Sequence, residues 1–458
     1  MFAARPPLLR FWYRRGPEAL TAITFHDDLM TPGLVDREDP APTTSGMVTL
    51  RLDSFGRLLY FDRVPPQKQT YPLTPAPPDW APLFAAANLD FAQFKPADPQ
   101  WLSLSAFDAR AAWTGTWPGT SRPLRVEAAV WSGYPVYFHI VEPWTKTDRT
   151  PQDDGSSSGA ALAMLALIAV GICAGSFLIA RRNLAQGRGD RRGAWRLAAF
   201  MFCVHMALWL ARSHMGSGSS ALGLFLLALC TSVFYGVVIW TVYLALEPHV
   251  RRRWPQALMG WSSLLIGRVR DPIVGRDVLI GAAIGVVLTA LSGLLDEWMR
   301  RRSGWTPNLV GSDLLTGAAG TIGRVLLQTS HGVREGLFFF FLVFLFRVVL
   351  RNQWLAALAF AGLFAGFNVM ANHPLPSVML SFVVLFGFAY ALVRWGLLAL
   401  AVGVLCGDLL ENAPITANTS AWYFPSGLLM VAAVAVLAAW AFRTSLGGRK
   451  VWKQDLLG

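Results

Sequence analysis

The feature that most constrains this chain is a series of apolar runs, each about one membrane thickness long, that follows Gly159. A helix needs about 20 mainly apolar residues to cross the hydrocarbon core of a bilayer. Inside lipid every backbone N–H and C=O must be bonded internally, so separate apolar runs predict separate spanning helices. We therefore predict a polytopic α-helical membrane protein with about nine spans, near residues 159–180, 196–212, 221–246, 277–297, 336–350, 355–371, 377–393, 396–411 and 426–442.

The residues up to Ser158 have a different character, since they are polar and rich in proline. The whole chain is only 15% charged, whereas soluble domains are about a quarter charged, and the apolar runs account for the deficit. This contrast predicts an N-terminal soluble domain joined to a membrane domain by a flexible polar linker. The expected boundaries are a domain over residues 1–150, a linker over 151–158, a helical bundle over 159–446 and a tail over 447–458.

The soluble domain has the pattern of an α+β fold. Two pairs of β-prone runs predict hairpins, at 47–53 with 57–62 and at 125–131 with 135–141, and residues 83–94 predict a helix. Six of the domain's tryptophans allow two interpretations, a ligand pocket or a small aromatic core, and the core is favoured because aromatic side chains dominate core burial. These six are Trp80, Trp101, Trp113, Trp117, Trp131 and Trp144.

The charge and the cysteines exclude several classes of function. The net charge of +12 lies mostly in arginine clusters beside the apolar runs, and a nucleic-acid-binding face is not distributed in that way, so we expect no nucleic-acid partner. The four cysteines fall inside predicted spans, which excludes a disulfide framework and a CxxC zinc site. The seven histidines form no HExxH motif, and we expect neither a metal nor a cofactor.

Arginines in the short loops predict the orientation. They follow the first and third spans and precede the fourth, whereas the opposite loops are mostly neutral, with Arg300–Arg302 as the exception. Loops rich in arginine stay in the cytoplasm. We therefore expect a plasma (inner) membrane location, with the bilayer as partner, the soluble domain and its ligand outside the cytoplasm, and the C-terminus inside. Met1–Arg10 lacks the apolar core of a signal peptide, so an upstream segment is expected to direct translocation.

A series of short motifs runs along nearly the whole chain. It includes Phe11–Arg14, Val64–Gln67, Ala180–Asn183, Gly187–Gly193, Leu246–Pro248, Arg270–Pro272 and Ser420–Tyr423. Their order and spacing resemble the C-terminal half of large bacterial receptor-like serine/threonine protein kinases, in which an extracytoplasmic domain and a helical bundle follow the kinase. The kinase motifs (GxGxxG, the VAIK lysine, HRD and DFG) are missing from this sequence. The resemblance implies a membrane-embedded sensor or regulatory module whose partner is a cytoplasmic kinase domain.

Residues 330–415 carry a second pattern, formed by Arg334–Glu335, Phe364–Asn368 and Asp408–Asn412. It resembles the CPBP (CAAX-protease-like) intramembrane protease family, whose helices bear EExxxR, FxxxH and HxxxN. The resemblance implies Glu335, Asn368, Asp408 and Asn412 as candidate catalytic residues. Arg334 replaces the first glutamate, Phe339 the arginine, and Asn368 and Asp408 the two histidines, which favours a degenerate, non-catalytic copy.

No intact catalytic motif is present, so the sequence leaves the question of enzymatic activity open between these two hypotheses. Ionisable residues inside spans are costly and are candidates for function. Arg347 lies close to Arg351, and we interpret it as an anchor that reaches the membrane surface. Asn368 and Asp408 have a second interpretation, as side chains that bond across helices and hold the bundle together.

Overall fold

A computed structural model describes the chain over residues 5–7, 9–22, 30–68, 77–147, 149, 157–214, 219–303, 312–315, 317–371 and 373–448. The chain forms two compact units, a sheet unit built mainly from residues before Asp153 and a helical unit built mainly from residues after it. Most of the predicted linker and the tail beyond Gly448 lie outside the described residues.

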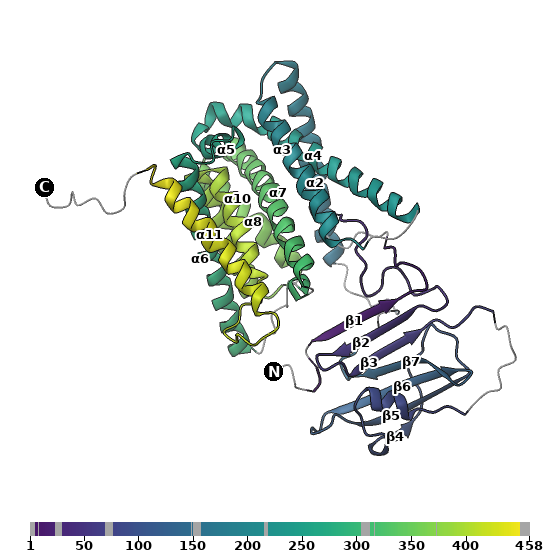
Figure 1. The fold of residues 1–458 in the computed structure, drawn as a ribbon. Helices are drawn as coiled ribbons and strands as arrows, with labels where there is room; N and C mark the ends of the chain where they lie inside the picture. The colour runs from purple at the N-terminus through teal and green to yellow at the C-terminus, as the bar shows by residue number, and fades with distance from the viewer. Residues whose placement is uncertain are drawn as a thin grey trace. The chain divides into compact units, whose positions relative to one another are not determined.

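The sheet unit contains one antiparallel sheet in the order β1-β2-β3-β7-β6-β5-β4 (Figure 1). In each half of the sheet, strands that follow one another in the chain are neighbours. The pairing of β3 with β7 joins the two halves at the centre of the sheet. The strands are β1 (Arg10–Arg15), β2 (Val48–Asp53), β3 (Leu58–Arg63), β4 (Lys95–Ala97), β5 (Ala109–Thr116), β6 (Pro123–Trp131) and β7 (Tyr134–Val141).

Both predicted hairpins are present, as β2–β3 and β6–β7. In the second, Ser132 and Gly133 have φ values of 51° and 79°, which is the geometry of a two-residue turn that matches strand twist. The single helix predicted over 83–94 is wrong, because the segment divides into α1 (Ala81–Ala86) and the short helix η1 (Phe91–Gln93). Asn88, at φ 53°, turns the backbone out of the helical region between them.

The core of the sheet unit is aromatic. Phe84 of α1 is 1% exposed and its ring meets Trp113 edge-on at 5.2 Å and Phe138 at 6.2 Å. Trp113 and Trp117 are buried in the same cluster, which agrees with the core interpretation of these two tryptophans. Trp144, in contrast, is 55% exposed and contributes nothing to that core.

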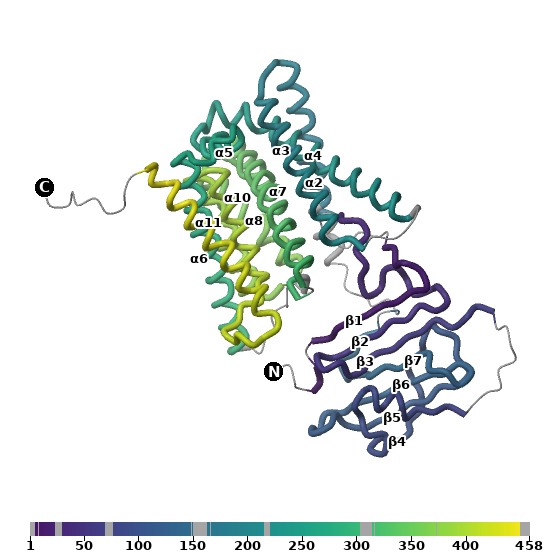
Figure 2. Tube along the Cα trace, viewed as in Figure 1, coloured from purple at the N-terminus to yellow at the C-terminus, as the bar shows by residue number. Residues whose placement is uncertain are grey.

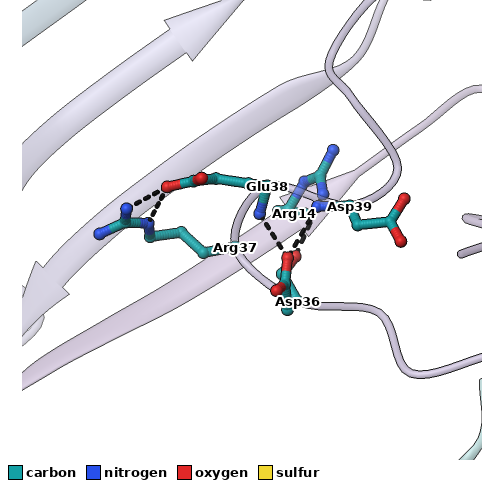
Figure 3. A network of polar contacts seen from close by, with 5 residues as sticks. All are labelled: Arg14, Asp36, Arg37, Glu38 and Asp39. Atoms are coloured by element: carbon teal, nitrogen blue, oxygen red, sulfur yellow. Dashed lines mark hydrogen bonds and ion pairs between the residues drawn. The ribbon is translucent and has the colours of Figure 1, made fainter. Parts of the chain in front are cut away.

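A buried arginine fastens the long segment between β1 and β2. Arg14 of β1 donates a hydrogen bond to the carbonyl of Asp36 (Figure 3) and another to the carbonyl of Pro40. The Asp36 carboxylate in turn accepts the backbone N–H groups of Glu38 and Asp39, each at 2.7 Å. These bonds close the turn on itself, because its polar groups find partners within the loop and on the neighbouring strand.

The helical unit accounts for all nine predicted apolar segments with a helix each. Seven of these helices, among the described residues, are long and apolar enough to cross a membrane: α2, α3, α4, α6, α8, α9 and α11. The helices are α2 (Ser157–Ala185), α3 (Arg191–Arg212), α4 (Ser219–Arg253), α5 (Met259–Leu265), α6 (Pro272–Ser303), α7 (Ala318–Leu350), α8 (Gln353–Met370), α9 (Leu375–Trp395), α10 (Leu397–Glu411) and α11 (Phe424–Ser445), with short helices η2 (Pro255–Leu258) and η3 (Ser312–Leu315).

The remaining two helices differ from ordinary spans, so the count of nine stays a prediction. Helix α7 carries charged side chains near its middle, and α10 has only 15 residues. At 1.5 Å per residue α10 is shorter than the roughly 30 Å hydrocarbon core. It is also the most buried helix of the unit and packs against α6, α7, α9 and α11 (Figures 1 and 2).

Glycines let the neighbouring helices approach α10 closely. A Cβ atom on Gly281 or Gly285 of α6 would lie 2.5 Å from a carbonyl oxygen of α10, and one on Gly332 of α7 would lie 2.8 Å from another. Small residues at such contacts allow backbones to pack tightly, which is the main source of helix association in lipid. The glycines of α6 and α7 therefore fix the position of α10.

This packing predicts different effects for two alanine substitutions on α6. Gly285→Ala places a methyl group against Gly403 and should destabilise the bundle by about 1–3 kcal/mol, the cost of overpacking. Gly293→Ala meets nothing within 4 Å and should leave stability unchanged or slightly raised, because alanine favours helix. Unfolding of the detergent-solubilised protein by SDS measures both, and equal stability of the two variants contradicts the role of Gly285.

Candidate functional site

A stripe of polar side chains runs along one face of α7. Arg324, Gln328, His331 and Glu335 are spaced by four, three and four residues, which places them one above another on a helix. The stripe reaches the middle of α7, where ionisable groups are costly in lipid unless they are paired. Its partner on a neighbouring helix is Asp408 of α10.

His331 lies between two carboxylates. Its Nδ1 is 3.7 Å from Oε1 of Glu335, one turn along α7, and 3.9 Å from Oδ2 of Asp408 on α10. Arg334 extends the group, with its Nη2 3.8 Å from the same Glu335 oxygen. The side chain of His331 is 16% exposed, so this junction, formed by His331, Glu335 and Asp408, is largely enclosed.

Gln328 ties the same stripe to α10. In the amide orientation that gives both ends a partner, its nitrogen donates to Asp408 Oδ2 at 3.1 Å and its oxygen accepts from Arg324 Nε at 3.0 Å. Asp408 therefore receives a hydrogen bond from α7 and faces His331 as well. Two acids, Glu335 and Asp408, and two guanidinium groups, Arg324 and Arg334, balance the charge around the histidine.

A second histidine links α7 to α3. Nε2 of His205 lies 2.9 Å from Oγ of Ser330, and the His205 ring stacks on Tyr235 of α4 at 4.4 Å. Both His205 and Ser330 are buried. Polar side chains of α7 thus contact α3 on one side and α10 on the other.

The candidate residues taken from the protease-like pattern separate into two groups. Glu335 and Asp408 meet at His331, whereas Asn412 donates to the Asp408 carbonyl of its own helix at 2.8 Å. Asn368 donates to Ser381 Oγ at 2.9 Å and so joins α8 to α9.

Sequence reasoning missed His331 and Gln328. The protease-like pattern includes Glu335 as its one candidate on α7, and the absence of an HExxH motif gives no signal for His331. A search for mixed polar pairs at three- and four-residue spacing would have found His331 with Glu335. Among the described residues, no three His, Cys, Asp or Glu side chains gather closely enough to hold a metal ion.

A second polar group lies on the sheet unit, on the face opposite the aromatic core. Asp62 of β3 accepts from Ser105 Oγ at 2.7 Å and from Tyr60 Oη at 3.1 Å. The Tyr60 ring meets His139 of β7 edge-on at 5.2 Å, and Trp101 meets the same imidazole edge-on at 5.5 Å. Burial raises the pKa of Asp62 above its ordinary value, and hydrogen bonds only partly offset this effect.

No protein-family model, curated protein or solved structure matches this chain. The kinase-like and protease-like resemblances therefore rest on the quoted motifs, and both stay predictions.

The junction predicts a measurable coupling between α7 and α10. A double-mutant cycle on His331→Ala and Asp408→Ala should give an interaction free energy of about 0.6 kcal/mol, with about 1.7 kcal/mol as the upper range for polar contacts between membrane helices. SDS unfolding measures each corner of the cycle. His331→Ala with Asn412→Ala is the control pair, since Asn412 bonds its own helix, and strictly additive effects in the first cycle would rule the junction out.

The raised pKa of Asp62 predicts a pH dependence of the sheet unit. A carboxyl whose pKa is higher in the folded state binds more protons there, so stability falls as pH rises from the unfolded pKa of about 3.9 through the folded pKa. Asp62→Asn should remove this slope. Hydrogen exchange of β3 and β7 amides, corrected for intrinsic rates, measures it, and an unchanged slope in the variant contradicts the assignment.

Proposed function

We propose that this protein is a membrane-embedded sensor or regulatory module without catalytic activity of its own, in which the helical unit transmits a state of the sheet unit. The observation that carries the proposal is the position of His331 between Glu335 on its own helix and Asp408 on α10. One imidazole with two acidic partners on different helices gives α7 and α10 a contact that can exist in two arrangements.

Helix shifts of about 1–2 Å are an ordinary form of switching in helical assemblies. The two distances at His331, 3.7 and 3.9 Å, are nearly equal, so a shift of that size favours one acid over the other. A signal requires an input whose affinity for the two arrangements differs. In this proposal the input changes the equilibrium between the two arrangements of the junction.

The sheet unit supplies the input in this proposal. Its polar face, with Tyr60, Asp62 and His139, offers hydrogen-bonding groups to an extracytoplasmic ligand. The arginine-rich loops of the helical unit support a cytoplasmic location for those loops. The output is contact with a cytoplasmic kinase domain, as the resemblance to receptor-like kinases implies. The proposed location is a bacterial plasma membrane.

The alternative function is a CPBP-like intramembrane hydrolase. Glu335 and Asp408 beside His331 form a group that is able to activate water, which is the specific observation in its favour. Two other observations favour the sensor. The Asn368 amide donates to Ser381, and Phe339, at the position of the family's arginine, packs its ring against Phe360 at 5.1 Å.

Coupling between two parts of a sensor is reciprocal, so a change at the junction must alter the sheet unit. Asp408→Asn keeps the size of the side chain and removes the charge that faces His331. In lipid nanodiscs this variant should change hydrogen exchange in β3 or β7 at least about twofold relative to the unaltered protein, a shift of roughly 0.4 kcal/mol. Thr329→Val is the matched control, because Thr329 Oγ1 bonds the Val325 carbonyl of its own helix.

Two outcomes count against the sensor. Exchange that changes only in α7 and α10 shows no transmission. Cleavage of a lipidated reporter peptide by the unaltered protein, lost in Glu335→Gln, would instead establish the hydrolase.

A further inference from the structure

A pocket outside the polar junction lies where four helices of the helical unit end or begin. Its volume is about 350 Å³, within the usual range for small-molecule sites. Helices α4, α7 and α9 each place an arginine of the last turn on its wall: Arg253, Arg347 and Arg394. No carboxylate lines it among the described residues, so its three positive charges face a common space without an acid.

Arg347 is the innermost of the three arginines. Its guanidinium stacks over the ring of Trp254 with Cζ 4.3 Å from the centroid, and this contact holds the group in place. Its Nη1 is buried and has no hydrogen-bond partner among the described residues. The Arg347 side chain as a whole is only partly buried and lines the pocket, so its other guanidinium N–H groups are the donors that a ligand oxygen reaches.

The first turn of α8 adds further positive character. Gln353 and Trp354 line the pocket at the start of that helix, which is the positive end of the helix dipole. Asn352 Oδ1 already accepts the N–H groups of Trp354 and Leu355, so the helix end contributes through its dipole. The pocket thus combines three guanidinium groups with a helix N-terminus. Such a combination selects an anion, and the forked guanidinium matches phosphate oxygens.

Aromatic residues place this pocket at the level of lipid headgroups. Trp354 stacks on Tyr390 at 5.6 Å, and Tyr390 meets Trp395 at the same distance. Tryptophan and tyrosine gather at membrane–water interfaces, where their rings lie among the headgroups.

The surface next to the pocket is apolar and uncovered. On α7 Leu350 is 40% exposed, and on α8 Leu358 is 44% exposed. Leu350 is three residues from Arg347 and Leu358 is four residues from Trp354, so each shares a helix face with a residue that lines the pocket. An occupant with both a phosphate and hydrocarbon chains would satisfy both surfaces, which favours a phospholipid over a free phosphate.

We propose that this arginine pocket binds the headgroup of an anionic phospholipid, with the acyl chains against the exposed faces of α7 and α8. Basic pockets between membrane helices are suited to such lipids. Arg347 is then more than a surface anchor, because its guanidinium, which lines the pocket, donates to a phosphate oxygen. The site is independent of the sensor role, since it shares no residue with the junction.

The test uses the purified full chain in detergent and measures lipid retention by native mass spectrometry. Phosphatidylglycerol should bind at least tenfold more tightly than phosphatidylcholine, and inorganic phosphate or glycerol phosphate should compete weakly. Arg347→Gln should weaken phosphatidylglycerol binding roughly fivefold, the effect of one charge near the membrane surface, and Arg253→Gln with Arg394→Gln should weaken it further.

Arg443→Gln is the matched control, because Arg443 is an exposed arginine in the last turn of α11 and does not line the pocket. It should leave binding unchanged. If Arg347→Gln fails to fold, the Arg253 and Arg394 double variant decides, since both side chains are exposed.

Equal binding of the two lipids, or equal losses in the control and pocket variants, would falsify the lipid site. Competition by inorganic phosphate at the same concentration as the lipid would also overturn the proposal and assign the pocket to a free phosphate.

Discussion

The close approach of α10 to its neighbours is the contact on which the rest of the helical unit depends. In lipid there is little hydrophobic gain when apolar helices associate, so tight packing and polar contacts must hold a bundle together. Gly281 and Gly285 bring α6 against α10, and Gly332 brings α7. Because α10 is short and largely buried, its polar end brings Asp408 into contact with α7 while the carboxylate side chain stays 27% exposed.

This packing explains why polar residues are tolerated on α7. An isolated charge in the middle of a membrane helix is expensive, and each charged group of the stripe has a counterpart within reach. His331 faces Glu335 and Asp408, and Gln328 joins Asp408 to Arg324. Near the C-terminal end of the same helix, Arg347 stacks on Trp254. It faces a pocket that no carboxylate lines among the described residues. Helix α7 thus has a paired polar group around His331 near its middle and, near its C-terminal end, Arg347, which lines the arginine pocket.

Local sequence patterns predict the strands of the sheet unit better than the side-chain contacts of the helical unit. The hairpins of the sheet unit follow from alternating apolar residues and turn-forming pairs such as Ser132 and Gly133, which act over a few residues. The helix expected over 83–94 was wrong because α1 ends locally at Asn88, whose N–H bonds the Ala85 carbonyl while the Leu89 N–H bonds the Phe84 carbonyl. Asparagine is one of the residues that adopt this left-handed helix end, so the signal was local and was overlooked. Of the residues in the protease-like pattern, Glu335 and Asp408 both lie near His331, whereas the Asn368 amide bonds Ser381.

The sequence by itself determined that this is a membrane protein with a separate sheet-forming domain, because hydrocarbon thickness and the need for internal backbone hydrogen bonds leave one solution for repeated apolar runs. It also determined where ionisable residues enter the apolar segments. Only the tertiary structure decided which of them meet. Residues 331 and 408 are far apart along the chain, and their contact depends on how closely glycines allow α7 and α10 to pack. The arginine pocket is of the same kind, since four helix ends build it and no local pattern of any one helix encodes it.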